Sequence, residues 1–246
     1  MTERERVSDS IDARTPNVAR MYDYYLGGKD NYAVDREMAR EMIKQVPDVP
    51  LIARENRAFL RRAVRMCVDA GVRQFLDIGT GLPTQGNVHE IAQQAAPDAR
   101  VVYVDVDPVV LTHARALLSG TDGVTIIQGD VRRPDEILAH PELRELIDFR
   151  EPVAVLMLAL LHFVADDEDP YGIVDRFKAE LAPGGHLVIS HITADNQTPE
   201  VRDAARLYDR ASARLAQRTH AEISRFFDGL ELVEPGVTTV SLWRPD

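Results

Sequence analysis

Residues 74–87 read QFLDIGTGLPTQGN, an apolar run that leads directly into a turn containing Gly79 and Gly81. A continuous apolar run of this length is typical of a parallel strand that is buried on both faces. Glycines after such a strand allow the backbone to approach a ligand closely, where a Cβ atom would collide. In an open parallel sheet, ligands bind beyond the carboxyl ends of the strands. The stretch therefore predicts a parallel sheet and the position of its site.

Similar runs recur along the chain and alternate with helical segments. The further runs are VVYVDV (101–106), VTIIQGD (124–130), PVAVLML (152–158) and GHLVISHI (185–192). The helix after residue 106 has Asp107 as its N-cap, Pro108 in its first turn and Gly120 just past its end. Strand, helix and strand at this spacing predict right-handed crossovers and a doubly wound α/β sheet.

Two regions flank this alternating core. Residues 51–71 carry apolar residues at helical spacing and predict an amphipathic helix that Gly71 ends. Thr198-Pro199 predicts the start of a long helix that runs through Leu215. The runs GLELVEP (229–235) and VTTVSLW (237–243) predict a terminal antiparallel strand pair. We expect one domain with an N-terminal helical extension.

The composition excludes some partners. The chain has 246 residues and 29 basic against 40 acidic side chains, a formal charge of −11, which argues against a nucleic acid or an anionic membrane as the main partner. The arginines between residues 54 and 65 are expected on a solvated helix face. One cysteine, Cys67, permits no intrachain disulfide. The charged N-terminus and the short apolar runs predict a cytoplasmic protein without a membrane span.

The acids beside the glycine turn indicate the kind of ligand. A dinucleotide-binding turn has three glycines, and here Thr84 stands at the third position. Asp77 would also place a negative charge near a pyrophosphate. An acid two residues before the first glycine suits a cationic ligand without phosphates, and S-adenosylmethionine, with its sulfonium and ammonium groups, is such a ligand.

Two more acids end the next strands. Asp105 follows the glycines by about the 20 residues at which an acid receives ribose hydroxyls; hydroxyls donate and a carboxylate accepts. Asp107 competes for this role, although helix capping already accounts for it. Asp130 could accept a hydrogen bond from an adenine amino group while the Val131 N–H donates to a ring nitrogen of the adenine. The alternative is that Asp130 is only a turn residue.

Several motifs together resemble a known family. FLDIGTG, VVYVDVDP, QGDVRRP and ELAPGGHLVIS are similar to the motif series of class I S-adenosylmethionine-dependent methyltransferases. More narrowly, RMYDYYLGGKDNYAVDREMA, ARENRAFLRRAVR, GLPTQGNVHEIAQ and FFDGLELVEPG resemble the S-adenosyl methyltransferase family formerly named DUF574. The resemblance covers residues 20–243.

The resemblance implies a fold, a cofactor and a set of contacts. It implies a Rossmann-like, mostly parallel seven-stranded sheet of order 3-2-1-4-5-7-6, with a helical extension or lid at residues 1–71 and the methyltransferase domain at 72–246. The cofactor would be S-adenosyl-L-methionine. The resemblance implies that Asp77, Gly79 and Gly81 line the methionine part of the cofactor. It implies that Asp105 binds the ribose and that Asp130 and Val131 bind the adenine. Leu161 or His162 would lie beside the sulfonium and the acceptor. Pro83 departs from the third-glycine position of the class and puts the Gly81 contact in doubt.

The stretch ARMYDYYLGGKDNY (19–32) packs four tyrosines around two glycines. Tyrosine rings can cover an adenine or attract a sulfonium by a cation–π interaction. We expect the segment to lie across the cofactor site as a lid, with Tyr22 and Tyr25 at the cofactor and a tight turn at Gly27. The alternative is a helix whose tyrosines pack only on the core.

Methyl transfer depends mainly on positioning, and it needs a base only where the acceptor must lose a proton. His162 is the candidate base, while His191, among apolar neighbours, is expected to be structural. The sequence offers no convincing set of metal ligands. It favours a methyltransferase acting on a small molecule; a non-catalytic cofactor-binding protein and a nicotinamide-dependent oxidoreductase are the alternatives. The oligomeric state is left open.

Overall fold

The computed structural model describes residues 12–83, 86–195 and 197–245. The N-terminal residues 1–11 and Thr84 of the predicted turn lie outside this range. The five strands of the sheet are β1 (Gln74–Ile78), β2 (Arg100–Asp105), β3 (Val124–Gln128), β4 (Val153–Leu158) and β5 (His186–Ser190). They are all parallel and lie in the order β3-β2-β1-β4-β5. This confirms the α/β fold with a parallel, doubly wound sheet.

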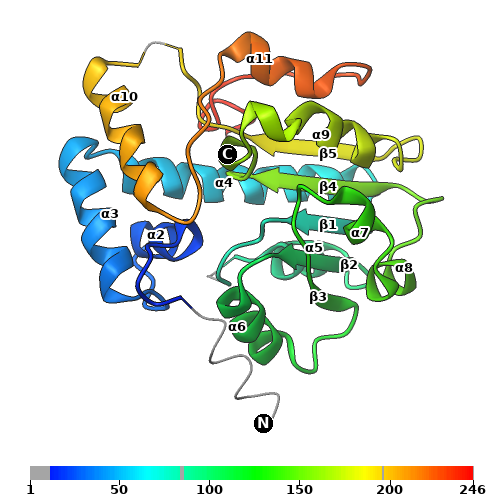
Figure 1. Ribbon diagram of the computed structural model, residues 1–246. Helices are drawn as coiled ribbons and strands as arrows, with labels where there is room; N and C mark the ends of the chain where they lie inside the picture. The colour runs from blue at the N-terminus through cyan, green and yellow to red at the C-terminus, as the bar shows by residue number, and fades with distance from the viewer. Residues whose placement is uncertain (1–11, 84–85, 196, 246) are drawn as a thin grey trace.

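Helices cover both faces of the sheet (Figure 1). One face packs on α4 (Val49–Asp69), α5 (Val88–Ala95) and α6 (Pro108–Leu118). The other packs on α7 (Pro134–Leu138), α8 (Pro141–Leu146), α9 (Pro170–Lys178) and α11 (His220–Ser224). Successive strand residues alternate between the two layers, so that Phe75 joins the first apolar cluster and Leu76 the second. The central strands β1 and β4 are buried along their whole length, as their continuous apolar sequences predict.

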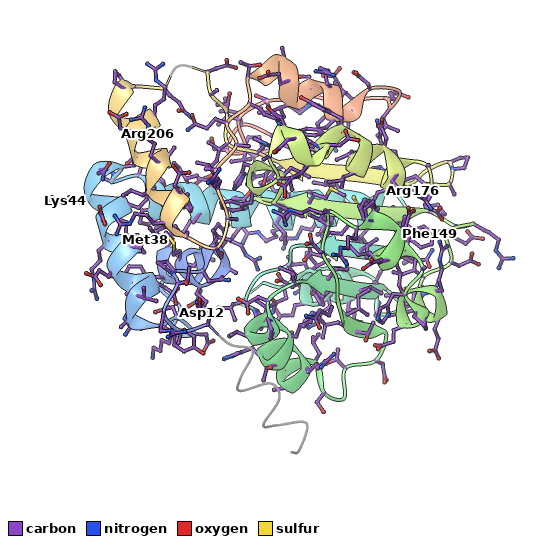
Figure 2. The ribbon with its side chains drawn as sticks, in the orientation of Figure 1. Asp12, Met38, Lys44, Phe149, Arg176 and Arg206 are labelled. Atoms are coloured by element: carbon purple, nitrogen blue, oxygen red, sulfur yellow. The ribbon has the colours of Figure 1, made fainter. Side chains whose placement is uncertain are left out.

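A third group of helices lies beyond the carboxyl ends of the strands. It consists of α2 (Val18–Tyr25), α3 (Ala33–Gln45) and α10 (Pro199–Ala205), on the side to which the strand arrows point in Figure 1. Their apolar cluster contains Met21, Tyr25 and Met38, and α4 adds Ala53 to it. Figure 2 shows Met38 turned inward from α3, whereas Lys44 on the same helix points outward. Helices far apart in the sequence thus form one layer over the strand ends.

The tyrosine-rich stretch is a helix followed by a tight turn. Asn17 caps α2 by accepting hydrogen bonds from the backbone N–H groups of Ala19 and Arg20. Past the end of the helix, the Asp23 carboxylate accepts from the backbone N–H of Asp30 at 3.1 Å. A Cβ atom at Gly28 would lie only 1.9 Å from Asp23 Oδ1, so this turn requires glycine there.

The predicted terminal strand pair is not present in residues 229–243, which form turns, bends and irregular backbone outside the sheet. The sheet described here therefore has five strands instead of seven. The reason lies in the partners of this segment. Arg62 donates to the carbonyl oxygens of Trp243 and Val240, at 2.9 and 2.6 Å, so that a side chain occupies acceptors that a ladder would use. Arg62 is accordingly buried, so the expectation of a solvated arginine face is wrong for this residue, whereas Arg54, Arg61 and Arg65 are exposed.

The helix that begins after Thr198 is also shorter than predicted. It ends at Ala205 and continues as a 3-10 turn, η3 (Arg206–Arg210). Beyond it, backbone N–H groups turn to other segments, because Ser212 donates to Pro16 and Ala216 donates to His162. Among the described residues, no helix combines the length and apolar character needed to cross a bilayer.

Candidate functional site

A cavity of about 1740 Å³ opens where the carboxyl ends of the strands meet the N-terminal helices and α10. Nine of the residues predicted for the site line this cavity, and they come from four strand ends and from α2. These residues are Asp77, Gly79, Gly81, Asp105, Asp130, Val131, His162, Tyr22 and Tyr25. The fold therefore gathers side chains from across the sequence around one space, as parallel strand ends do.

The glycine turn after β1 is held against β2. The backbone N–H of Gly79 donates to the carbonyl of Val104 at 2.8 Å. Gly79 has a φ of +71°, and a Cβ atom there would lie 2.6 Å from Leu160 Cδ1. Gly81 has a φ of +66°, and a Cβ atom there would meet nothing within 4 Å. The first glycine is thus required by packing, whereas the second leaves the backbone open to the cavity.

Asp105 organises this turn in addition to facing the cavity. Its carboxylate accepts hydrogen bonds from the backbone N–H groups of Gly81 and Asp107, each at 2.9 Å. Two oxygens offer about four acceptor sites, so positions for further donors remain. Burial raises the pKa of Asp105 to about 6, although the backbone donors partly counter this rise.

Asp77 is a second buried acid at the same edge. Burial raises its pKa to about 6, and the positive charge of Arg57 on α4 partly counters the rise. Arg57 also donates to the carbonyl of Gly86 at 2.8 Å, so it links α4 to the far side of the glycine turn. Sequence reasoning missed this role for Arg57 because the helix and the turn meet only in the folded chain.

The two other acids already have partners. Asp130 accepts from the backbone N–H of Arg132 at 3.0 Å and forms an ion pair with its guanidinium, as expected of a turn residue, yet it also lines the cavity. Asp107 caps α6 through Oδ1, which accepts from the Val109 N–H at 2.8 Å. Its buried Oδ2 has no hydrogen-bond partner and lies 3.8 Å from an amino nitrogen of Arg20. Each of these acids therefore has a structural partner and also lines the cavity.

The structure places two predicted residues away from the cavity. Leu161 is fully buried in the core on the α7–α9 side of the sheet, because the chain turns at Ala159, with a φ of +52°, and begins a 3-10 turn at Leu161. Leu160 takes its place on the cavity wall. Gly27, with a φ of +81°, follows the end of α2 and is not among the lining residues, and its conformation ends the helix.

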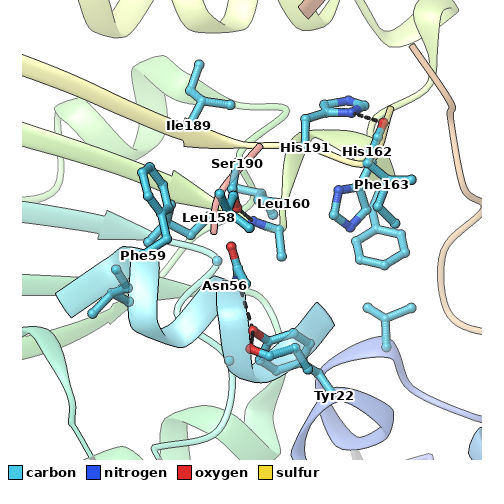
Figure 3. Close-up of a pocket in the computed structure, with 18 of the residues that line it drawn as sticks. Tyr22, Asn56, Phe59, Leu158, Leu160, His162, Phe163, Ile189, Ser190 and His191 are labelled. Atoms are coloured by element: carbon cyan, nitrogen blue, oxygen red, sulfur yellow. Dashed lines mark hydrogen bonds between the residues drawn. The ribbon is translucent and has the colours of Figure 1, made fainter. Parts of the chain in front are cut away.

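His162 lines the cavity and lies between two aromatic neighbours (Figure 3). Its ring centroid is 4.4 Å from that of Phe163 and 5.4 Å from that of His191. Burial lowers the pKa of His162 well below its ordinary value, and the positive charge of Arg218 lowers it further. The imidazole is therefore neutral at neutral pH and can accept a hydrogen bond.

His191 is satisfied, as predicted for a structural histidine. Its Nδ1–H donates to the Ile192 carbonyl at 2.7 Å, so Nε2 accepts from Arg218 at 2.9 Å. Arg218 also donates to the carbonyls of Leu161 and Val164 on either side of His162. This buried arginine, which sequence reasoning missed, fixes the loop that carries His162.

Asn56 of α4 is a further lining residue that the sequence analysis missed. Its Nδ2 donates to the hydroxyl of Tyr22 at 2.9 Å, which ties α4 to α2 across the cavity wall. A signal was available: Asn56 lies three and four residues before Phe59 and Leu60, so it is a polar residue on the apolar stripe of a helix. Tyr22 itself lines the cavity and Tyr25 both lines it and packs in the helical cluster, so the lid and packing interpretations both describe this segment.

Comparisons with known proteins agree with this arrangement. The model of the S-adenosyl methyltransferase family matches residues 4–246. A DUF574 family protein of Streptomyces avermitilis is 46% identical, with 96% of this chain and 91% of that chain covered and a TM-score of 0.92. A protein of Thermobifida fusca described as a candidate methyltransferase is 44% identical, with 94% and 87% covered and a TM-score of 0.90.

A more distant structure shares the fold alone. Mitomycin 7-O-methyltransferase is 20% identical, with 93% of this chain and 69% of that chain covered and a TM-score of 0.50. A search of curated proteins found no match.

The residues present suit the cofactor of the family. S-adenosylmethionine carries an ammonium, a sulfonium and two ribose hydroxyls, and the cavity edge offers buried carboxylates to receive such groups. The open space at Gly81 leaves room for a ligand against the backbone. The sequence motifs, the parallel sheet with its cavity, and a family match along nearly the whole chain agree, and they place this protein in the S-adenosyl methyltransferase family, as a methyltransferase that uses S-adenosylmethionine.

Proposed function

We propose that the protein transfers the methyl group of S-adenosylmethionine to a small-molecule acceptor bound in the same cavity. The size of that cavity carries the proposal. Binding sites for one drug-sized ligand have volumes of about 300–1,000 Å³, and this cavity has about 1740 Å³. It therefore has room for the cofactor and for a second molecule beside it. Family membership removes the nicotinamide-dependent oxidoreductase from the hypotheses.

We assign the cofactor contacts to the strand ends. Asp105, or Asp107 through Oδ2, which accepts no hydrogen bond, would accept from the ribose hydroxyls, and Asp77 would attract the ammonium group. The backbone at Gly79 and Gly81 would border the methionine part. These contacts are supported by the burial of the acids and by the open space above the second glycine.

The adenine would lie further along the same edge. Asp130 and Val131 line the cavity after β3, where an amino group and a ring nitrogen would meet a carboxylate and a backbone N–H. Val106, which follows Asp105, is 54% exposed and lines the cavity. An exposed valine there offers an apolar surface to a flat ring, and this supports placing the adenine beside it.

When bound, the cofactor supplies a methyl group on a positively charged sulfur. The protein would position the acceptor against it and exclude water, which accounts for much of the acceleration in such displacements. Tyr22 and Tyr25, together with α2, cover part of the cavity. His162 is neutral and faces the cavity, so it would accept a hydrogen bond from a hydroxyl or amine acceptor and orient it toward the methyl group.

The first test is cofactor binding. Isothermal titration should show that S-adenosylmethionine and S-adenosylhomocysteine bind and that NAD does not. Asp105→Asn keeps the shape and one acceptor oxygen for the turn, and it should weaken S-adenosylhomocysteine binding about tenfold or more because a charged acceptor is lost. Asp122→Asn, an exposed acid between α6 and β3, is the matched control. An Asp105→Asn variant with unchanged affinity would contradict the ribose assignment.

The second test is turnover. The protein is incubated with S-adenosylmethionine labelled in its methyl group and with a metabolite extract divided into small-molecule and macromolecular fractions. We expect label in the small-molecule fraction, and His162→Gln should lower kcat with little change in cofactor affinity. Label found only in protein or nucleic acid would refute the proposed acceptor class.

A further inference from the structure

Five described residues that line the cavity carry a buried polar atom without a hydrogen-bond partner, namely Asn56, Asp107, His162, His186 and Gln197. Two of these atoms, Oδ1 of Asn56 and Nδ1 of His162, belong to residues labelled in the part of the cavity that Figure 3 shows. The two residues are only 8% and 4% exposed, and both line the cavity. A buried polar atom without a partner costs about 1–3 kcal/mol, so native proteins seldom keep one without a reason. Two such atoms in one cavity indicate a site for a polar group of a ligand.

The direction of the Asn56 amide follows from its neighbours. The Ala53 carbonyl can only accept, so the Tyr22 hydroxyl donates its proton to it, at 3.1 Å. The Tyr22 oxygen must then accept from Asn56, and only the NH₂ end of the amide can donate, at 2.9 Å. Oδ1 of Asn56 is therefore turned away from Tyr22, and Figure 3 shows it on the side of Leu158 and Ser190. An amide oxygen held in this way can only accept.

The wall around these atoms is apolar. Figure 3 shows aromatic and aliphatic side chains from α4, from the end of β4 and from the loop after β4 on the same cavity. They are Phe59, Leu158, Leu160 and Phe163. Ser190 contributes a hydroxyl, but its oxygen already accepts from the Ala159 N–H at 2.9 Å.

The two histidines of this part of the cavity are uncharged at neutral pH. Burial lowers the pKa of His191 to about 4 and that of His162 further below its ordinary value. Arg218, the nearest cation in this group, is engaged by Asp166, by two backbone carbonyls and by His191. A charged ligand would thus find no free counter-charge among these side chains, and its desolvation would not be offset.

We propose that Asn56, His162 and the four apolar residues named above form an acceptor pocket for an uncharged, largely apolar molecule. This molecule carries a hydroxyl or N–H group that donates to Oδ1 of Asn56. This inference rests on the proposed function and specifies its acceptor. Tyr22 is the positioning residue, because its hydroxyl fixes the direction of the Asn56 amide.

The test uses the full chain saturated with S-adenosylhomocysteine. The probes are phenols with one to three rings, the methyl ether of each phenol, and the carboxylate of each skeleton, measured by isothermal titration at neutral pH. We expect at least one phenol to bind about tenfold more tightly than its ether and its carboxylate. The ether lacks the hydrogen-bond donor, and the carboxylate carries a charge that the pocket does not compensate. Failure of every phenol to bind, or equal binding of the carboxylates, would overturn the proposal.

Variants assign the effect to the amide. Asn56→Ala should bring the affinity for the phenol down to that for its ether and leave S-adenosylhomocysteine affinity unchanged. Tyr22→Phe should cause a smaller loss, about threefold, because the amide remains but can turn. Arg54→Ala, on the exposed face of the same helix and outside the cavity lining, is the matched control and should behave as the wild type.

The outcomes separate the two proposals. If the wild type does not bind S-adenosylhomocysteine, the proposed function fails, and the acceptor pocket fails with it. If the wild type binds it but Asn56→Ala keeps the preference for phenols, only the acceptor pocket is refuted. A loss of S-adenosylhomocysteine affinity in Asn56→Ala equal to the loss of phenol affinity would assign Asn56 to the cofactor and would also refute the pocket.

Discussion

At the level of single residues, Asp77 and Asp105 are carboxyl groups that are buried and that also line the cavity. Each carboxyl is buried at a strand end, and burial raises the pKa of each to about 6. Because these values lie above the ordinary value for aspartate, the folded protein holds protons that the unfolded chain releases between about pH 4 and pH 6. The free energy of unfolding contributed by these groups therefore falls as the pH rises through that interval. A cationic ligand with hydroxyl donors would offset this cost.

The pH dependence of cofactor binding follows from the same values. Ionised carboxylates attract an ammonium group and accept hydroxyl protons, so affinity should rise with pH. We expect S-adenosylhomocysteine to bind about tenfold more tightly at about pH 7.5 than at about pH 5 for each carboxyl that must be ionised. Asp77→Asn should bind more weakly at the higher pH and show a flatter profile. An affinity that does not change between these pH values would contradict the role of both acids.

Elements with continuous apolar sequences could be predicted, and those decided by distant partners could not. The strands follow from local pattern, since β1, β2 and β4 are buried almost throughout, and α4 follows from its apolar stripe, which is buried while its other face is exposed. Residues 229–243 have the pattern of strands, but Arg62 takes two of their carbonyl groups. In the candidate site, the acids at the strand ends could be predicted because the carboxyl ends of parallel strands lie at the same edge of the sheet. Asn56 and Arg218 were missed because their partners are distant in sequence.

The turn after β1 can be tested with a pair of glycines in the same conformation. Gly81 and Gly120 both have positive φ, +66° and +85°, and a Cβ atom at either would meet nothing within 4 Å. Alanine at either position should therefore destabilise the fold by a similar amount, about 1–2 kcal/mol, measured by urea unfolding. Only Gly81 lines the cavity, so only Gly81→Ala should weaken S-adenosylhomocysteine binding beyond this shared effect. Equal cofactor affinities of the two variants would remove Gly81 from the site.

At the scale of the whole molecule, the N-terminal helices and the sheet are joined through one buried arginine. Arg20 of α2 forms an ion pair with Asp35 of α3 at 2.8 Å, and both side chains are almost fully buried. Its guanidinium also lies 3.8 Å from Asp107, which caps α6 at the end of β2, and 4.8 Å from the ring centroid of Tyr32. The segment that covers the cavity is thereby linked to the strand end where we place the ribose.

Removal of this arginine should affect both stability and binding. Arg20→Ala leaves the carboxylate of Asp35 buried without its counter-charge, so the free energy of unfolding should fall by about 3–5 kcal/mol. Arg210→Ala breaks an exposed ion pair with Glu41 at 3.5 Å and should cost about 1 kcal/mol or less. Urea unfolding of the two variants measures the difference.

Since Arg20 also holds α2 against the cofactor edge, hydrogen exchange of α2 should slow when S-adenosylhomocysteine binds to the wild type. In Arg20→Ala, the ligand should slow this exchange less. Exchange of α2 that is unaffected by the ligand in the wild type would show that these helices do not cover the bound cofactor.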